Sequence, residues 1–416
     1  MSRPLAMDKL LRDILKTRDI SELPPSKLAE MVHYLIKHEI SPGGPYEFSG
    51  KVDAAAANKH IQRVFIASNK PLIKTSLPNS ISGQHLAASV ASLYRQAENE
   101  SLPGLTESEK DLAKSMLDTI KLSDVHGEIC QLSQLFYASL SPKNVALARC
   151  TEKSLRQLSI ANIFTWGTYS FVDRILDKNN SNNLMQFLPI ILKFQRTSIT
   201  QYLAADAQPD QAFELFNSVD QANSLELDLR KSISIDKKRD KITIYSLPSL
   251  STLRDLMPRK SIAHVLGPLT IIQHSSTVSI LDTTAAMYAY CAARQYQDDL
   301  HDWIDDLLNG ELTYSIGLLF AAAKIKPGVH SLSTLKSQLQ QVYWNDVLET
   351  SCKEIERLID TSITSLERSV LTEKSKFVIK IIKPIASAAR QARKRHLYEK
   401  SFLSAFTKNQ VAVSTN

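Results

Sequence analysis

The chain has 416 residues, enough for one large helical domain or two modest ones. Its share of hydrophobic residues, 43%, and of charged residues, 22%, is ordinary for a globular protein, and its formal charge is +7. No stretch approaches the ~18 uninterrupted apolar residues of a membrane span, and residues 1–15 lack the continuous apolar core of a signal peptide. A membrane-spanning helix is therefore excluded, and we expect a soluble, cytoplasmic protein.

Residue types that make tight turns or cross-links are sparse. The chain has 11 glycines, against a usual share of about 7%, and sheets joined by tight turns usually need more. Its cysteines are far apart and show no CxxC spacing, which argues against a zinc site or a disulfide framework. We expect long helices joined by short connections, with the thiols reduced.

Residues 1–82 are predicted to form a small helical extension, and residues 83–416 one helical domain. Within the extension, Pro24-Pro25 separates two short amphipathic segments, and residues 41–46 form a turn cluster. After a linker, helical periodicity resumes over residues 86–97 and continues in the next predicted helix, which includes residues 107–120.

The predicted helices become long from residue 154 onward. The clearest apolar stripe runs over residues 332–370, and its spacings of three to five residues keep it on one face of a helix or a helix pair. Residues 241–247 alternate enough for one short strand, which does not change the class. The chain is therefore predicted to be all-α.

The most informative segment is residues 297–306, where five of nine consecutive positions carry a carboxylate. On an α-helix each residue advances ~100°, so Asp298, Asp302 and Asp306 lie along one face, with Asp299 on its flank. Like charges four residues apart destabilise a helix by a few tenths of a kcal/mol per pair. A hard cation reverses that effect, since Mg²⁺ takes one or two carboxylates together with phosphate oxygens and water.

A second acidic pair lies upstream at Asp173 and Asp177, again four residues apart and near the end of an aromatic-rich segment. Taken alone, this pair could mark a helix end, because Lys178 and two asparagines follow it. Residues 297–306 taken alone could be a solvated acidic surface, although Trp303 gives that helix a second, apolar face. Metal binding is favoured because the two segments occur together.

The two segments resemble the aspartate-rich motifs of the class I terpenoid synthase and isoprenyl diphosphate synthase superfamily. Residues 298–302 match its DDxxD motif, and Asp298, Asp302 and Asp306 approximate the acidic triad of its cyclases. The first motif reads Asp-Arg-Ile-Leu-Asp at residues 173–177. The first and last acids of this motif, the usual metal contacts in the family, are therefore both present.

Two further segments carry the resemblance. Lys260-Ser261 is similar to the Lys-Thr pair that contacts substrate phosphate in this superfamily, and Arg294-Gln295 stands where chain-elongating relatives have Phe-Gln. The order and approximate separation of these elements agree with the superfamily, and the resemblance covers roughly residues 110–400.

The resemblance implies a class I terpenoid synthase helical bundle that binds a prenyl diphosphate through several Mg²⁺ ions, with Mn²⁺ as a substitute. The acids for which it implies a catalytic role are Asp173, Asp177, Asp298 and Asp302. The acids for which it implies metal binding are Asp173, Asp177, Asp298, Asp299, Asp302 and Asp306. The residues expected to contact the substrate are Lys260, Arg294, Arg259 and Gln295.

Two departures from the family pattern bear on function. Arg174 replaces the second aspartate of the first motif, where it either stays outside the site or neutralises the acidic pair. No GGKR-type segment, by which chain-elongating relatives hold a second diphosphate, is evident. This absence favours a Mg²⁺-dependent terpene synthase, a diphosphate lyase that ionises or cyclises one prenyl diphosphate, over a chain-elongating prenyltransferase.

Other interpretations stay open. Arg174 suggests a catalytically degenerate homologue that binds a prenyl diphosphate or a protein partner; in that case Arg174→Asp should increase metal-dependent binding. The basic run over residues 374–395 is compatible with peripheral membrane contact, although a solvated helix face is the simpler interpretation. No nucleic-acid partner is expected, and a homodimer would fit the superfamily. Residues 31–66 faintly resemble one α-toroid repeat, for which a helical cap is the simpler account.

Overall fold

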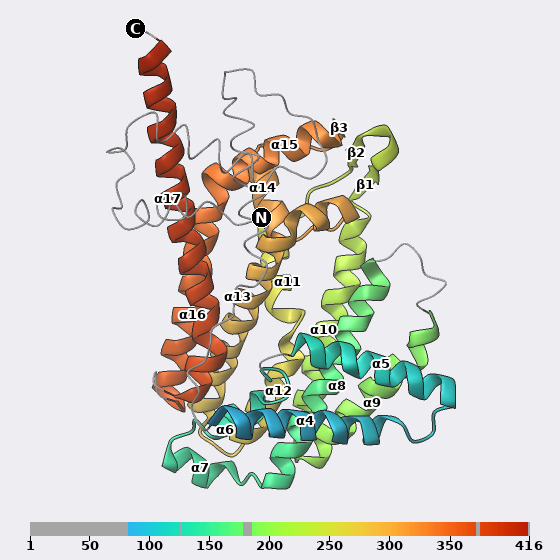
Figure 1. Ribbon diagram of the computed structural model, residues 1–416. Coiled ribbons are helices and arrows are strands. Elements are labelled where there is room, and N and C mark those ends of the chain that lie inside the picture. Colours follow the sequence, from blue (N-terminus) through green and yellow to red (C-terminus); the bar gives the residue numbers. More distant parts are fainter. Residues whose placement is uncertain (1–81, 125–126, 178–184, 372–374, 415–416) are drawn as a thin grey trace, which may run out of the picture.

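The computed structural model describes residues 82–124, 127–177, 185–371 and 375–414, which form a bundle of helices with one small sheet (Figure 1). The predicted N-terminal extension lies outside the described residues except for Ser82. Its boundary with the helical domain therefore stays a prediction. None of the described helices combines the length and the apolar character that a bilayer crossing needs.

The first half of the bundle contains α4 (Ser82–Ser101), α5 (Glu107–Ser123), α6 (Leu132–Tyr137), α7 (Pro142–Ala148), α8 (Glu152–Asp177), η3 (Met185–Phe187), α9 (Leu188–Ala204) and α10 (Pro209–Arg230). The second half contains η4 (Lys237–Arg239), α11 (Leu250–Arg259), η5 (Ile262–Val265), α12 (Leu266–Ile272), α13 (Thr277–Asn309), α14 (Tyr314–Ala322), α15 (Leu332–Val342), η6 (Tyr343–Val347), α16 (Leu348–Ser369), η7 (Val378–Ile382) and α17 (Lys383–Ser414). Both predicted helices that follow the linker are present, as α4 and α5.

Local signals explain where key helices begin and end. A capping box starts α5: the Thr106 hydroxyl accepts the Glu109 backbone N–H, and the Glu109 carboxylate accepts the Thr106 N–H. The Ser276 hydroxyl caps α13 by accepting the Ser279 N–H, and Gly310, with φ of 78°, ends the helix in the left-handed conformation. These caps set the limits of the long helix that carries the second acidic segment.

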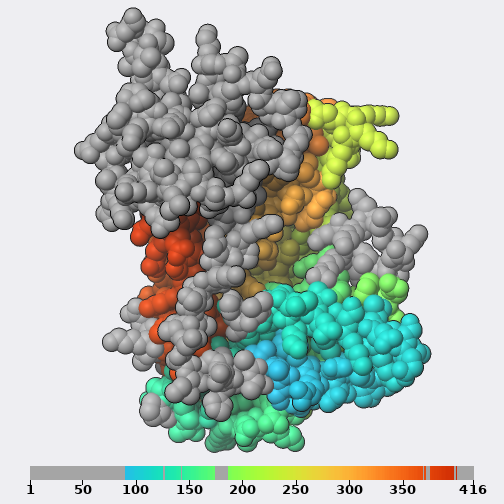
Figure 2. All heavy atoms as spheres, in the orientation of Figure 1, coloured from blue at the N-terminus to red at the C-terminus, as the bar shows by residue number. Residues whose placement is uncertain are grey.

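Helix α13 runs through the middle of the bundle and packs along α16, which in turn packs against α17 (Figure 1). Helices α8 and α9 form another closely packed pair. Helices α4 and α5 appear in blue and cyan at the lower right of the described surface (Figure 2). Helices α8 and α13, which carry the two acidic segments, both contribute residues to the cavity described below.

The buried apolar side chains form two clusters. The larger one joins α6, α8 and the helices from α9 to α17, and the smaller one joins α4, α5, α8 and α9. Side chains of the smaller cluster pack directly against the backbone of α8 at Gly167. A Cβ at this position would lie 2.7 Å from Ile120 Cδ1 and 3.1 Å from Phe194 Cδ2. Helix α8 therefore contributes one face to each cluster, and its end reaches the site described below.

The small sheet has the order β1 (Ile233–Asp236), β2 (Lys241–Ile244) and β3 (Gly328–Ser331), with both pairs antiparallel. Strand β2 confirms the short strand predicted within residues 241–247. Strands β1 and β3 were not predicted, because neither has an alternating pattern long enough to distinguish it from a loop. The sheet leaves the all-α class unchanged, and that prediction is confirmed.

The apolar stripe predicted over residues 332–370 lies on α15, η6 and α16, which follow one another along the chain. Its members Leu335, Leu339, Val347 and Cys352 are buried. The spacing of five residues from Val342 to Val347 is too wide for an α-helix, and a π-helical turn, η6, accommodates it. The extra residue keeps the apolar side chains of both segments directed to the core.

Candidate active site

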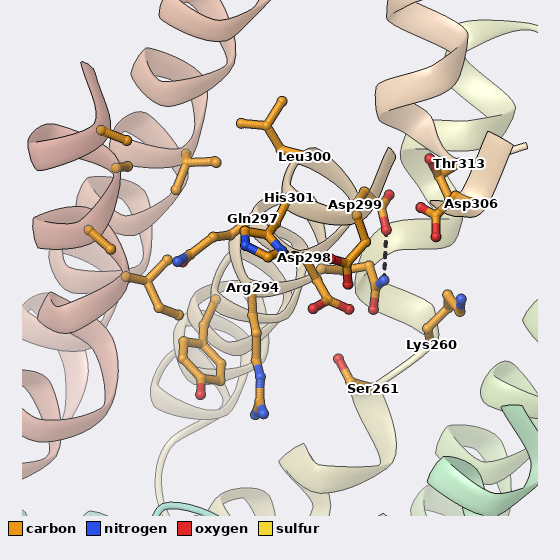
Figure 3. A pocket seen from close by; sticks show the side chains of 18 of the residues that line it. Lys260, Ser261, Arg294, Gln297, Asp298, Asp299, Leu300, His301, Asp306 and Thr313 are labelled. Carbon is orange, nitrogen blue, oxygen red and sulfur yellow. Dashed lines mark hydrogen bonds and ion pairs between the residues drawn. The ribbon is translucent and has the colours of Figure 1, made fainter. Parts of the chain in front are cut away.

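A partly open cavity of about 850 Å³ lies among α8, η5, α13, η6, α16 and α17. Figure 3 shows its centre, where Asp298 lies between Asp299 and Asp306 on one side and Gln297 and His301 on the other. The cavity therefore has a strongly acidic side and a side that leads toward α16 and α17.

One wall of the cavity is the acidic face of α13. Asp298, Asp299, Asp302 and Asp306 all line it, as expected for residues spaced by about one helical turn. Asp299 is only 6% exposed, and the side-chain amide of Gln295 donates to its Oδ1 at 2.8 Å. Gln295 is thus placed to orient a carboxylate of this wall, a contact that the sequence did not predict.

The other acidic segment contributes Asp173, at the end of α8, to the same cavity. The structure therefore brings one acid of the first motif and the acids of the second motif around one space. The side chains of Arg174 and Asp177 lie outside the described part of the chain. The predicted metal-binding role of Asp177 and the effect of Arg174 stay predictions.

Lys260 stands between the acidic helices and is ion-paired. Its Nζ lies 2.9 Å from Oε2 and 3.1 Å from Oε1 of Glu226 in α10. Burial alone would lower the pKa of Lys260, but the charges of Glu226, Asp173 and Asp299 outweigh it, and the pKa is raised. Lys260 therefore stays a cation between α8 and α13, held in place by a carboxylate from a third helix.

Glu226 belongs to a buried ionic cluster that sequence analysis missed. Arg230 lies 3.9 Å from Glu226 and 3.5 Å from Glu311, and both carboxylates line the cavity. Nothing in the sequence distinguishes Glu226 from the other acids of α10. Only the packing of α10 against η5 and the loop before α14 makes these residues part of the site.

Arg294 extends from α13 over the ring of Trp166, with its guanidinium carbon 4.6 Å from the ring centroid. Burial would lower the pKa of Arg294, but Tyr290, Glu128, Cys291 and Asp298 raise it. The arginine thus remains charged at the cavity wall, below the acidic face in Figure 3.

Arg259, the remaining predicted substrate contact, is placed outside the cavity. Its guanidinium donates to the Ser218 hydroxyl at 3.3 Å and to Gln221 Oε1 at 3.0 Å, in a surface groove next to Tyr288. Arg259 is therefore not brought together with Lys260 in the cavity, because the helix turn that directs Lys260 inward directs its neighbour outward. Its predicted contact with the substrate stays a prediction.

Asp298, Asp299 and Asp306 of α13 hold protons more tightly than ordinary aspartates. Burial raises the pKa of Asp306 to about 9, with further contributions from Asp299 and Glu311. Burial also raises the pKa of Asp299 to about 7, against the opposing effects of Lys260 and Gln295. The Asp298 carboxyl opens into the cavity, yet burial and the neighbouring Asp302 raise its pKa as well.

These raised pKa values predict how stability depends on pH without metal. The folded protein binds the Asp306 and Asp299 protons more tightly than the unfolded chain, whose aspartates titrate near about 4. The free energy of unfolding should therefore fall as pH rises from about 4 through the folded values of about 7 and about 9.

Urea unfolding in a metal chelator at several pH values would measure this decline. Asp306→Asn should flatten it, whereas Asp305→Asn, on the exposed side of the same helix, should not. An Asp306→Asn variant with the same decline as the unaltered protein would contradict the prediction.

The charges of the cavity fit a cation shared with an anionic ligand. Among the described lining residues, eight carboxylates face only three basic side chains. Within the described part of the chain, however, no group of three or more His, Cys, Asp or Glu side chains is close enough to hold a metal ion alone. Mg²⁺ commonly takes one or two carboxylates and completes its shell with phosphate oxygens and water, so the residues fit Mg²⁺ in that form.

Comparison with protein-family models and with curated proteins gives no match. Solved structures do match. A geranylgeranyl pyrophosphate synthase from Lactobacillus brevis has a TM-score of 0.54 at 12% identity, over 75% of this chain and 97% of its own. One from the archaeon Geoglobus acetivorans has a TM-score of 0.51 at 13% identity, over 76% and 99%.

A third match is a geranylgeranyl pyrophosphate synthase from Corynebacterium glutamicum, complexed with isoprenyl diphosphate and magnesium. It has a TM-score of 0.50 at 13% identity, over 74% of this chain and 98% of its own. These similarities confirm the predicted fold: the chain is a helical bundle of the class I terpenoid synthase type. At such identities they establish the fold alone.

Proposed function

We propose that the cavity binds a prenyl diphosphate and ionises its allylic C–O bond with the help of Mg²⁺. The observation that carries this proposal is the position of Lys260, whose charge lies near Asp173 of α8, Asp299 of α13 and Glu226 of α10 in one cavity. A cation between two acidic helices is suited to a highly charged anion that arrives with its own metal ions.

Each part of the cavity has a role in this reaction. Mg²⁺, when bound, would stabilise the charge that develops on the departing diphosphate. Asp173, Asp298 and Asp302 would hold the metal, and Lys260 and Arg294 would donate hydrogen bonds to the same diphosphate. Exclusion of bulk water by the surrounding helices would protect the allylic cation from premature capture.

The apolar side of the cavity suits an isoprenoid chain. It is formed by residues of α16 and α17 that recur with helical spacing: Leu348, Cys352, Ile355, Ile385, Ala388, Ala389 and Ala392. The two sides of the cavity therefore match the two ends of a prenyl diphosphate. The diphosphate, with its Mg²⁺ ions, would lie at the acidic side, and the hydrocarbon chain would lie against the apolar wall. Hydrocarbon burial of this kind contributes about 0.8 kcal/mol per CH₂ group.

Chain elongation, in which a second prenyl diphosphate captures the allylic cation, is the outcome we propose first. It is supported by the three solved structures named above, each of which is a geranylgeranyl pyrophosphate synthase. Cyclisation or simple loss of diphosphate is the second candidate, and the specific observation in its favour is the missing GGKR-type segment.

A diphosphate-release assay tests the proposal. The protein is mixed with C10 to C25 allylic diphosphates, with and without Mg²⁺ and with and without isopentenyl diphosphate, and the products are analysed. Release that requires both Mg²⁺ and isopentenyl diphosphate, with a longer diphosphate as product, is expected for elongation. Release without isopentenyl diphosphate, giving a hydrocarbon or an alcohol, would establish a terpene synthase instead.

No release under any of these conditions would overturn the catalytic proposal. Magnesium-dependent binding of a prenyl diphosphate without turnover would then indicate the degenerate homologue. In that case Arg174→Asp, which restores the usual second acid of the first motif, should strengthen binding.

A further inference from the structure

His264, on the 3₁₀ turn η5, lines the cavity but has no role in the scheme above. Its Nδ1 lies 2.7 Å from Oδ1 of Asn162 in α8. Its ring packs against Trp166, with the centroids 5.3 Å apart, on the wall where Arg294 also lies. The imidazole is therefore fixed in position beside the space assigned to the substrate.

Contacts around Asn162 determine which nitrogen of His264 carries the proton. The Asn162 side-chain amide donates to the Ile129 carbonyl at 2.6 Å, which identifies the other terminal atom as the oxygen. That oxygen also accepts the Tyr202 hydroxyl at 3.3 Å. Because Oδ1 can only accept, Nδ1 of His264 must be the donor, and the lone pair of the neutral ring is on Nε2.

The imidazole ring of His264 stays neutral near neutral pH. Burial, together with the nearby charge of Arg294, lowers the pKa of His264 to about 3. Nε2 makes no hydrogen bond to another described residue. It is accessible to solvent, unlike the buried polar atoms that lack a partner. The cavity thus has an unprotonated acceptor on its wall.

We propose that Nε2 of His264 removes the proton that ends the carbocation reaction, an inference that rests on the proposed function. A C–H bond next to the cationic carbon breaks, and its electron pair forms the C=C bond of the product. The proton moves to Nε2 and is then passed to the released diphosphate, which restores the neutral ring. The step applies equally to an elongated and to a cyclised cation.

Other groups around the cavity are less suitable for this step. Lys260 and Arg294 are already protonated cations, and the aspartates are assigned to the metal ions. His301 also lines the cavity, but its Nδ1 lies 2.6 Å from Asp302 Oδ1 and so is bound to the metal-binding wall. A weak base is sufficient, because a C–H bond beside a carbocation is far more acidic than an imidazolium.

His264→Asn provides the test, because the asparagine amide can donate to Asn162 Oδ1 as Nδ1 does, yet has no basic nitrogen. Magnesium-dependent diphosphate release should be retained, whereas product formed by proton loss should fall by about 100-fold, with alcohols from capture by water in its place. His330→Asn, at a half-buried histidine of β3 that does not line the cavity, is the matched control and should leave the products unchanged.

Release with unchanged products in His264→Asn would overturn the role of His264 alone, whereas no release by the unaltered protein would overturn the proposed function. An independent measurement is ¹⁵N NMR of labelled histidine in the unaltered protein. A hydrogen on Nδ1 and none on Nε2 near neutral pH is expected, and an Nε2–H tautomer would overturn the inference whatever the activity.

Discussion

Asp298→Ala is expected to lower magnesium-dependent diphosphate release by about 100-fold or more, because it removes a metal-binding carboxylate from the centre of the acidic wall. Asp298 opens into the cavity near Asp302, and their mutual repulsion without metal is relieved when a cation binds. Its loss should leave the fold intact, because the side chain opens into the cavity and does not pack in the apolar core. Asp302→Ala should have a similar effect.

Asp305→Ala is the matched control, since Asp305 lies on the same helix but outside the cavity. Its release rate should stay close to that of the unaltered protein. Circular dichroism and thermal unfolding of all three variants would separate loss of the site from loss of structure. Full activity in both Asp298→Ala and Asp302→Ala would reject the assignment of the acidic wall to metal binding.

Lys260→Ala is expected to lower the free energy of unfolding by about 3 kcal/mol, because removing one partner of a buried ion pair leaves an uncompensated charge. The side chains of Lys260 and Glu226 are only 20% and 10% exposed. Arg230, at 3.9 Å from Glu226, compensates only in part because it is also close to Glu311. Urea unfolding at neutral pH in a metal chelator would measure the change.

Lys231→Ala offers the comparison for this prediction. Lys231 pairs with Asp228 at 2.7 Å, but their side chains are 78% and 68% exposed, and such surface pairs contribute only about 0.5 kcal/mol. The double variant Lys260→Met with Glu226→Gln removes both charges and should recover part of the lost stability. An effect of Lys260→Ala as small as that of Lys231→Ala would show that the cavity tolerates the unpaired carboxylate.

Much of the fold follows from local patterns. Apolar periodicity predicted the helices α4, α5, α15 and α16, and the alternating segment predicted β2. The motifs, through their resemblance to a known superfamily, predicted the class I terpenoid synthase bundle, which the solved structures confirm. The π-helical turn η6 was not foreseen, because a spacing of five residues in a list of apolar positions is equally compatible with a break between two helices.

Placement of the acids on α13 likewise follows from the sequence by itself, because the geometry of an α-helix puts residues about one turn apart on one face. Tertiary structure alone decided which partners these acids meet. Lys260 finds Glu226, 34 residues away, and His264 finds Asn162, 102 residues away. Such pairs depend on how separate helices pack, which local periodicity does not specify. Arg259 shows the same limit, because a neighbour of Lys260 in sequence lies outside the cavity once the helix turns.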